Sequence, residues 1–87
     1  MFKEHLNNNK DNIIKTISDL VEIPSVSDEN SNSEFPFGEN CNKALEYILN
    51  LGKQMGFRTK NVDGYCGYIE FGEGTELVGI IGHLDVV

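Results

Sequence analysis

The sequence has 87 residues, 39% of them hydrophobic, and a formal net charge of −7 at pH 7. A chain of this length forms one small domain at most, and it lacks the roughly 18-residue apolar run that a membrane-spanning helix needs. The negative charge argues against nucleic acid or an anionic membrane surface as a partner. Its first ten residues lack the apolar stretch of a secretory signal, so we expect a cytoplasmic protein.

The first predicted element is an amphipathic helix. Its apolar side chains follow one face of a 3.6-residue period: Ile13, Ile14, Ile17, Leu20 and Val21. Phe2 and Leu6 extend this stripe backwards, but three consecutive asparagines are poor helix formers and leave that extension open. Pro24 predicts that the helix ends at or before Ile23. We interpret His5 as a solvated residue.

A polar, irregular stretch and a second helix follow. Residues 25–37 have the composition of a surface loop, and their serines lack the Gly-x-Ser-x-Gly turn of a nucleophile. Gly38 then precedes a predicted helix in which Glu39 complements the dipole of the first turn. Apolar and small residues keep helical spacing up to Met55, and Gly56 is the expected left-handed cap.

The second half of the sequence predicts a sheet. Residues 57–62 and 68–71 indicate two strands joined by a hairpin turn at Asp63-Gly64. Residues 77–87, with the sequence LVGIIGHLDVV, indicate a third strand that is buried on both faces. The order of elements predicts an α/β fold in which two N-terminal helices pack on a mixed sheet. Cys41 and Cys66 have no metal-ligand spacing, so we interpret them as buried, reduced thiols.

The terminal predicted strand carries a histidine and an aspartate, His83 and Asp85. In an extended chain they point to the same side, with Cα atoms roughly 6.6 Å apart. A His-x-Asp pair alone is a weak motif, and a polar pair at a strand end explains it equally well. However, a metal-bound imidazole needs a carboxylate or carbonyl that fixes its tautomer, and this pair supplies one. One histidine cannot hold a catalytic zinc ion, which takes three protein ligands.

The terminal Gly-His-Leu-Asp-Val-Val resembles the Gly-His-x-Asp-Val-Val motif of the zinc aminoacylase and carboxypeptidase-type metallopeptidase family. Other stretches are similar to the dipeptidase V branch, the Xaa-His or carnosinase-like dipeptidases: Phe35-Pro-Phe-Gly, the helix over 41–56 with its Met-Gly-Phe end, and Asn61-Val-Asp-Gly-Tyr-Cys-Gly-Tyr-Ile-Glu-Phe-Gly. The resemblance covers nearly the whole sequence. It implies that residues 1–87 are the N-terminal portion of a metallopeptidase catalytic domain, without the lid domain of the family.

This resemblance implies a chemistry for the two polar residues. Family members hydrolyse unblocked dipeptides with two zinc ions, which activate a water molecule and stabilise the oxyanion. His83 would bind one zinc ion, and Asp85 would serve the catalytic site by holding the His83 imidazole and raising its basicity. The family's bridging aspartate, glutamate base and other ligands would lie downstream of Val87. We therefore expect the isolated chain to bind zinc weakly or not at all and to be inactive.

Two alternatives to a dipeptidase segment stay open here: a small non-catalytic interaction or assembly domain, and a truncation product without a function. In each case, two helices and a hairpin cannot cover a terminal strand that is apolar on both faces. Uncovered strands and apolar patches attract other chains. We therefore expect self-association through residues 77–87, against the alternative of a monomer whose last strand is frayed.

Overall fold

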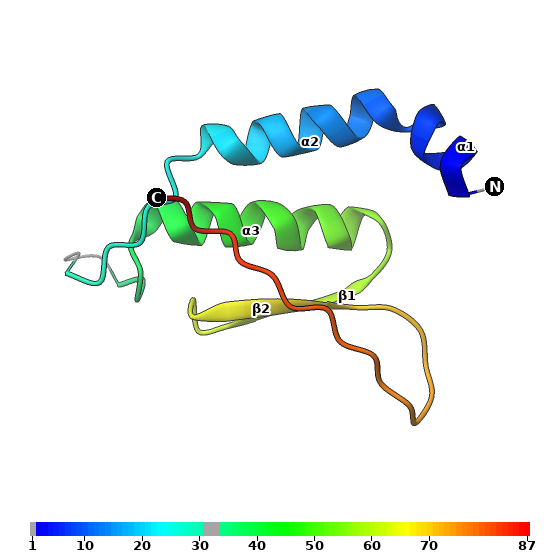
Figure 1. Ribbon diagram of the computed structural model, residues 1–87. Coiled ribbons are helices and arrows are strands. Elements are labelled where there is room, and N and C mark those ends of the chain that lie inside the picture. Colours follow the sequence, from blue (N-terminus) through cyan, green and yellow to red (C-terminus); the bar gives the residue numbers. More distant parts are fainter. Residues whose placement is uncertain (1, 31–33) are drawn as a thin grey trace.

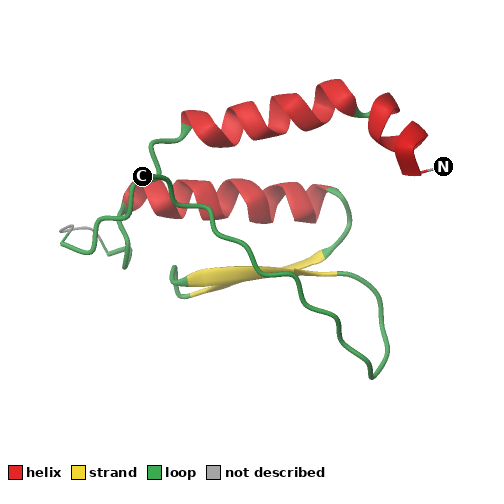
Figure 2. Cartoon of the chain, in the orientation of Figure 1, coloured by secondary structure: helices red, strands yellow, loops and turns green. Residues whose placement is uncertain are grey.

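The computed structural model describes residues 2–30 and 34–87, which stack in layers as a helix, a second helix and a hairpin (Figures 1 and 2). The described elements are, in chain order, α1 (Phe2–Asn8), α2 (Lys10–Glu22), α3 (Glu39–Gln54), β1 (Arg58–Val62) and β2 (Cys66–Glu70). The predicted α/β class is confirmed. Residues 31–33 of the predicted loop lie outside the described part. None of the helices described is long and apolar enough to cross a membrane.

The N-terminal apolar stripe forms two helices, because the chain turns at Asn9. The Asn9 side chain donates a hydrogen bond of 2.9 Å from Nδ2 to the His5 carbonyl. Such local bonds from asparagine compete with the helical pattern, so α1 and α2 are separate. Helix α2 ends where the sequence predicts, since the N–H of Ile23 donates to the Leu20 carbonyl and Pro24 follows. His5 is exposed, as expected.

Helix α3 has the predicted start and stop. Gly38 precedes it with a φ of 95°, and Gly56 follows it with a φ of 88°. The Gly56 N–H donates to the Lys53 carbonyl and the Phe57 N–H donates to the Gly52 carbonyl, each at 3.0 Å. These two bonds are those of a Schellman motif, which satisfies carbonyls that the helix end leaves open. The chain then reverses directly into β1.

The predicted hairpin is confirmed at its turn. Asp63 and Gly64 have φ values of 53° and 78°, the pair of positive angles that a type I′ turn requires. The Tyr65 N–H closes this turn on the Val62 carbonyl at 3.0 Å, and Asn61 Oδ1 accepts a bond of 2.8 Å from the Gly64 N–H. Strands β1 and β2 pair antiparallel, from Arg58 opposite Glu70 to Val62 opposite Cys66.

The core lies between α3 and this hairpin. Ala44 and Leu49 of α3 are buried, with 0% and 6% of their surface exposed. Gly67 of β2 faces them so closely that a Cβ there would lie 3.0 Å from Leu45 Cδ1 and 3.1 Å from Leu49 Cδ1. The helix can approach the strand only because position 67 has no side chain. Helix α2 adds no fully buried side chain to this core.

The prediction of a buried strand over residues 77–87 is wrong. This segment is extended, but within the described residues it forms only an isolated parallel bridge, between Val26 and Val86. Its apolar side chains lie in solvent: Leu77, Val78, Ile80 and Ile81 are 86–98% exposed. A central strand needs a neighbour to hydrogen-bond along its length, and β1 and β2 pair only with each other. The sheet is therefore antiparallel and two-stranded, not mixed.

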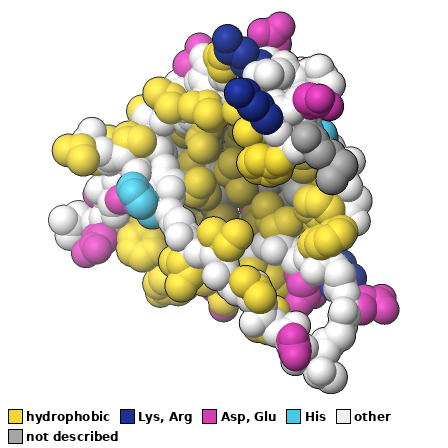
Figure 3. Space-filling model, turned by 45° about the vertical axis from the view of Figure 1, so that its right-hand side comes forward, with side chains coloured by type: hydrophobic (Ala, Val, Ile, Leu, Met, Phe, Trp, Pro, Cys, Tyr) yellow, Lys and Arg dark blue, Asp and Glu magenta, His cyan; other side chains and the backbone are white. Residues whose placement is uncertain are grey.

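The chain exposes more surface than an independent domain of its size. Its accessible surface is 7465 Å² for a mass of 9.7 kDa, against about 5,100 Å² for a typical folded monomer. The radius of gyration is 14.8 Å, against about 12 Å for a compact chain of this length. Hydrophobic side chains gather around a hollow on one face (Figure 3). Part of the excess surface comes from the exposed apolar side chains of residues 77–81, so no other part of the described structure covers this segment.

The close approach at Gly67 predicts a contrast between two substitutions. In Gly67→Ala the new Cβ would lie 2.9 Å from the Lys60 backbone carbonyl, which cannot move without distorting the hairpin. We expect the free energy of unfolding to fall by about 1–3 kcal/mol, as in other overpacked cores. In Gly52→Ala the Cβ meets the Ile69 side chain at 2.8 Å, and Ile69 is 41% exposed and can move.

Because alanine also favours the helix by about 1 kcal/mol, Gly52→Ala should change stability little. Urea denaturation followed by circular dichroism compares the two variants with the parent chain. An unfolding midpoint of Gly67→Ala equal to that of the parent would contradict the packing described for α3 and β2.

Candidate functional site

The candidate site lies where the last residues of the chain return to the loop between α2 and α3. In Figure 1 the terminal segment crosses α3 and ends beside the start of that loop. The contact is specific: the Ser25 hydroxyl donates to the Leu84 carbonyl at 3.0 Å, and the Val86 N–H donates to the Ser25 carbonyl at 3.0 Å. Two hydrogen bonds thus join Ser25 to residues 84 and 86, at the other end of the chain.

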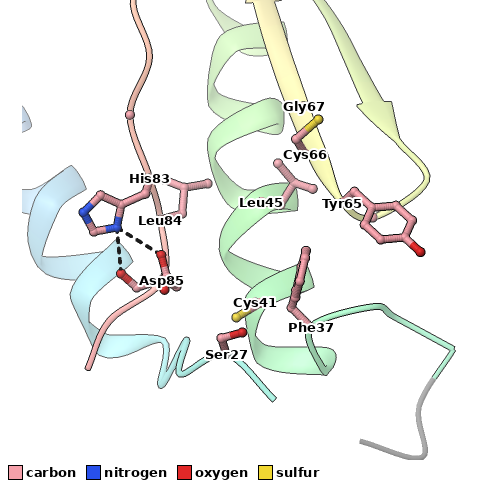
Figure 4. A pocket seen from close by; sticks show the side chains of 12 residues that line it. Ser27, Phe37, Cys41, Leu45, Tyr65, Cys66, Gly67, His83, Leu84 and Asp85 are labelled. Carbon is pink, nitrogen blue, oxygen red and sulfur yellow. Dashed lines mark hydrogen bonds and ion pairs between the residues drawn. The ribbon is translucent and has the colours of Figure 1, made fainter. Parts of the chain in front are cut away.

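His83 and Asp85 lie on the same side of this segment, as their spacing predicts. His83 Nδ1 is 3.0 Å from Asp85 Oδ1 and 3.2 Å from the Asp85 carbonyl oxygen (Figure 4). Both oxygens are acceptors, so Nδ1 carries the proton and donates to them. This tautomer leaves the lone pair of Nε2 free, which is the form in which histidine binds a metal ion.

The pair is open to solvent. The side chains of His83 and Asp85 are 84% and 53% exposed. A hydrogen bond this exposed contributes little to stability, so its geometry matters for orientation and not for folding. Leu84 points to the opposite side of the segment, towards α3 (Figure 4), and is half-buried. Because side chains alternate along an extended chain, His83 and Asp85 face solvent and Leu84, which lies between them in the sequence, faces α3.

A cavity of about 350 Å³ adjoins the pair. Besides His83 and Asp85, side chains from the loop, α3 and the hairpin line it, among them Phe37, Cys41, Leu45 and Tyr65 (Figure 4). The rings of Phe37 and Tyr65 meet edge to face, with centroids 5.8 Å apart. The walls are therefore largely apolar and aromatic, with polar groups at one side, which is the composition of a small-molecule site.

Cys41 connects α3 to the loop beneath the site. Its Sγ donates to the Ser25 carbonyl at 3.4 Å. Burial raises the pKa of the Cys41 thiol, and the negative charge of Asp85 raises it further. Both cysteines are free, as predicted, but Cys41 is half-buried and Cys66 is exposed, so the prediction that both are buried is wrong.

The residues present fit one part of a zinc site. The imidazole of His83, held at Nδ1 by a carboxylate, has the arrangement of a zinc ligand with its supporting partner. Within residues 2–30 and 34–87 there is no group of three or more histidine, cysteine, aspartate or glutamate side chains that could hold a metal ion. The described residues would therefore offer one candidate ligand with a supporting carboxylate, and not a complete coordination sphere.

Ser25 is the site residue that sequence reasoning missed. The sequence pattern around the loop serines excludes them as nucleophiles but does not indicate a structural role for any of them. Ser25 instead acts through hydrogen bonds and is 1% exposed, whereas the neighbouring serine, Ser27, is exposed. The neighbouring residues gave no signal, because Pro24 and Val26 on either side of it are both exposed.

Comparison with known proteins finds similarity to proteins named dipeptidases. A protein of Bacillus subtilis (strain 168) named "Putative dipeptidase YtjP" is 43% identical over 79 residues, which are 90% of this chain and 17% of that protein. The Beta-Ala-Xaa dipeptidase of Lactobacillus delbrueckii subsp. lactis is 41% identical over 87 residues, 99% of this chain and 18% of that enzyme. The chain is homologous to part of these dipeptidases. No protein-family model matches it.

The match confirms the resemblance that the motifs predict. A protein of Staphylococcus epidermidis (strain ATCC 12228 / FDA PCI 1200) named "Putative dipeptidase" is 38% identical over an alignment of 88 positions, which covers 100% of this chain and 19% of that protein. The chain thus spans less than a fifth of the length of these relatives. The similarity includes the loop, α3, the hairpin and the terminal segment, because it covers nearly the whole sequence.

The environment of Cys41 predicts its reactivity. A raised pKa keeps the thiol protonated, and the thiolate is the form that reacts with alkylating reagents. In a Cys66→Ser variant, we expect the rate of Cys41 alkylation to rise with a midpoint above the ordinary thiol value of about pH 8.5. Iodoacetamide labelling from pH 7 to pH 10.5, followed by mass spectrometry, measures this midpoint.

Asp85→Asn in the same Cys66→Ser background provides the control. It removes the negative charge near the thiol, so the midpoint should move down in pH while the effect of burial remains. A midpoint at or below the ordinary thiol value in the parent would contradict the burial of Cys41, and an equal midpoint in Asp85→Asn would contradict the position of the terminal segment beside α3.

Proposed function

We propose that this chain is the N-terminal segment of the catalytic domain of a dizinc dipeptidase that hydrolyses unblocked dipeptides in the cytoplasm. The observation that carries the proposal is the similarity of nearly the whole chain, at 38–43% identity, to proteins named dipeptidases. Two free thiols are in keeping with a reducing compartment. Peptide substrates follow from the names of the relatives.

In this proposal His83 binds one zinc ion through Nε2. Asp85 holds the imidazole by accepting a hydrogen bond from its Nδ1–H, so that the lone pair of Nε2 points away from the carboxylate. The negative charge of Asp85 also makes the imidazole a stronger electron donor. Asp85 is therefore a positioning residue for the ligand. Zinc, when bound, would act as a Lewis acid on the peptide carbonyl.

The remaining chemistry belongs to residues outside this chain. Among the described residues, no group of three or more histidine, cysteine, aspartate or glutamate side chains forms around His83 that could hold a metal ion. A single imidazole leaves coordination mostly to water, so the 87 residues alone should bind zinc weakly or not at all and should not hydrolyse dipeptides. This part of the proposal makes residues 1–87 a portion of a larger catalytic domain.

The exposed surface supports the same interpretation. The chain exposes 7465 Å², an excess of about 2,300 Å² over a typical monomer of its mass. The excess includes the apolar side chains at positions 77, 78, 80 and 81, which flank His83 on its N-terminal side. In a longer protein, further strands beside this segment would cover these side chains and bring other ligands to the imidazole.

Substitution of the aspartate tests the proposed function. In a protein that contains this chain at the length of its relatives, Asp85→Ala should leave the fold intact. It should lower zinc affinity or dipeptide hydrolysis by about 10–100-fold, the usual effect of losing the partner of a metal-bound histidine. Zinc titration and hydrolysis of β-Ala-His and other unblocked dipeptides measure both quantities. The longer reading frame is obtained by sequencing the DNA that follows the codon for Val87.

Two controls make this experiment decisive. His83→Ala removes the proposed ligand itself and should cost more than Asp85→Ala. Glu4→Ala removes an exposed carboxylate of α1, far from the pair in the sequence, and should leave zinc affinity unchanged. Unchanged turnover in Asp85→Ala would contradict the role of Asp85, and unchanged turnover in His83→Ala would contradict the metal site.

We also propose that the isolated chain self-associates through residues 77–87. The segment is extended and apolar, and its backbone N–H and C=O groups from residue 77 to residue 83 form no hydrogen bond with other described residues. Such a segment is a template for pairing with a second copy. The excess surface of about 2,300 Å² exceeds the 800 Å² or so that each partner contributes to a standard interface. The net charge of −7 opposes association at low salt.

Light scattering coupled to size exclusion at moderate salt measures this association. We expect the apparent mass to rise above 9.7 kDa over a tenfold increase in protein concentration. Ile80→Lys, which places a charge in the exposed apolar segment, should restore a monomer because charged residues block edge pairing. A folded monomer at all concentrations would contradict the proposal.

A further inference from the structure

Ser25 stands out as a fully buried polar side chain in an open molecule. It is 1% exposed, whereas the segment that contacts it is exposed at most positions. No buried side-chain nitrogen or oxygen among the described residues lacks a hydrogen-bond partner, so the Ser25 hydroxyl is satisfied by its contact with Leu84. The buried Ser25 hydroxyl thus lies at the contact between the terminal segment, which carries His83 and Asp85, and the loop that follows α2.

The hydrogen bonds of Ser25 lie on both sides of Asp85. The hydroxyl donates to the Leu84 carbonyl and the Ser25 carbonyl accepts from the Val86 N–H, each at 3.0 Å. We call these two bonds the Ser25 clamp. They fix the residues immediately before and after Asp85, so the backbone of Asp85 has little freedom to rotate. His83 Nδ1 donates to both the carboxylate and the carbonyl of Asp85. The orientation of the imidazole therefore depends on the backbone conformation of Asp85.

The clamp is itself supported by α3. Cys41 Sγ donates to the same Ser25 carbonyl that accepts from Val86. Preceding the clamp, the terminal segment from residue 77 to residue 83 makes no backbone hydrogen bond with other described residues. The position of the polar pair relative to the helices therefore depends on Ser25 and on the packing of half-buried Leu84.

We infer that Ser25 is the positioning residue of the His83–Asp85 pair: its clamp sets the backbone of Asp85, and through it the orientation and tautomer of the His83 imidazole. The consequence for zinc rests on the proposed function, but the clamp does not. Ser25 is not a nucleophile in this arrangement, since its hydroxyl proton is directed to a backbone carbonyl and no base contacts it among the described residues.

The test uses the 87-residue chain without metal or substrate. Ser25→Ala removes the hydroxyl and keeps the carbonyl, Ser25→Thr keeps both, and Ser27→Ala is the matched control two residues away on the exposed side of the loop. Long-range proton–nitrogen correlation spectra at pH 9, where an ordinary imidazole is neutral, give the fraction of His83 protonated at Nδ1. Amide exchange of Val86 reports on the second bond of the clamp.

We expect the parent, Ser25→Thr and Ser27→Ala to favour Nδ1–H. In Ser25→Ala this preference should fall towards that of an unstructured peptide, and the Val86 amide should exchange about 3–10-fold faster, the effect of one lost hydrogen bond. Circular dichroism checks that α2 and α3 remain. If Ser25→Ala loses helix content, the Val86→Pro variant is used as the test. It removes the hydrogen bond from the Val86 N–H to the Ser25 carbonyl, and Val86 does not lie in a helix.

The tautomer separates the possible outcomes. A loss of the Nδ1–H preference in Ser25→Ala or Val86→Pro, with helix content kept, supports the inference. An unchanged preference in both variants would overturn it, since the pair would then be held without the clamp. Because no zinc is used, a failure of the proposed dipeptidase chemistry in the Asp85→Ala experiment would leave this result unaffected.

Discussion

The packing of α3 against β2 is the contact on which the other parts of this chain depend. Leu45 and Leu49 reach the hairpin only because Gly67 offers no side chain, and this approach creates the small core. From the same helix, Cys41 contacts the loop at Ser25, and Tyr47 donates to Asp19 of α2 at 3.4 Å. Helix α3 thus touches the sheet on one side and the loop and α2 on others. If it separated from the hairpin, the terminal segment would lose the surface on which it lies.

The terminal segment shows the limit of what so small a core can support. It carries the most hydrophobic part of the sequence and is among the most exposed parts of the structure. Apolar side chains leave water only when a surface is available to cover them, and the two-stranded hairpin is already occupied by α3 on one face. The segment therefore stays extended, and its apolar side chains stay exposed to solvent. Its apolar character is suited to a larger sheet or to a second copy of the chain.

The polar pair combines local geometry with a distant support. His83 and Asp85 would face the same side in any extended chain, because side chains alternate with a period of two. Their hydrogen bond is exposed and weak by itself. What gives the pair a defined place is the Ser25 clamp, in which a buried hydroxyl meets a backbone carbonyl 59 residues away. In this protein the buried Ser25 side chain thus orients the solvent-exposed pair of His83 and Asp85.

The sequence by itself determined the features that depend on a residue's own backbone or on its near neighbours. Pro24 ends α2, Gly56 ends α3 and Asp63-Gly64 turns the hairpin, because each restricts or permits particular φ values irrespective of the rest of the chain. The similarity of its motifs to dipeptidases was visible for the same reason, since motifs are local strings. Only the tertiary structure decided that residues 77–87 join no sheet and that Ser25 holds them. Each of these two features depends on which groups far away in the sequence are available for hydrogen bonding. The contact of a single serine with such a group produces no periodic pattern in the sequence.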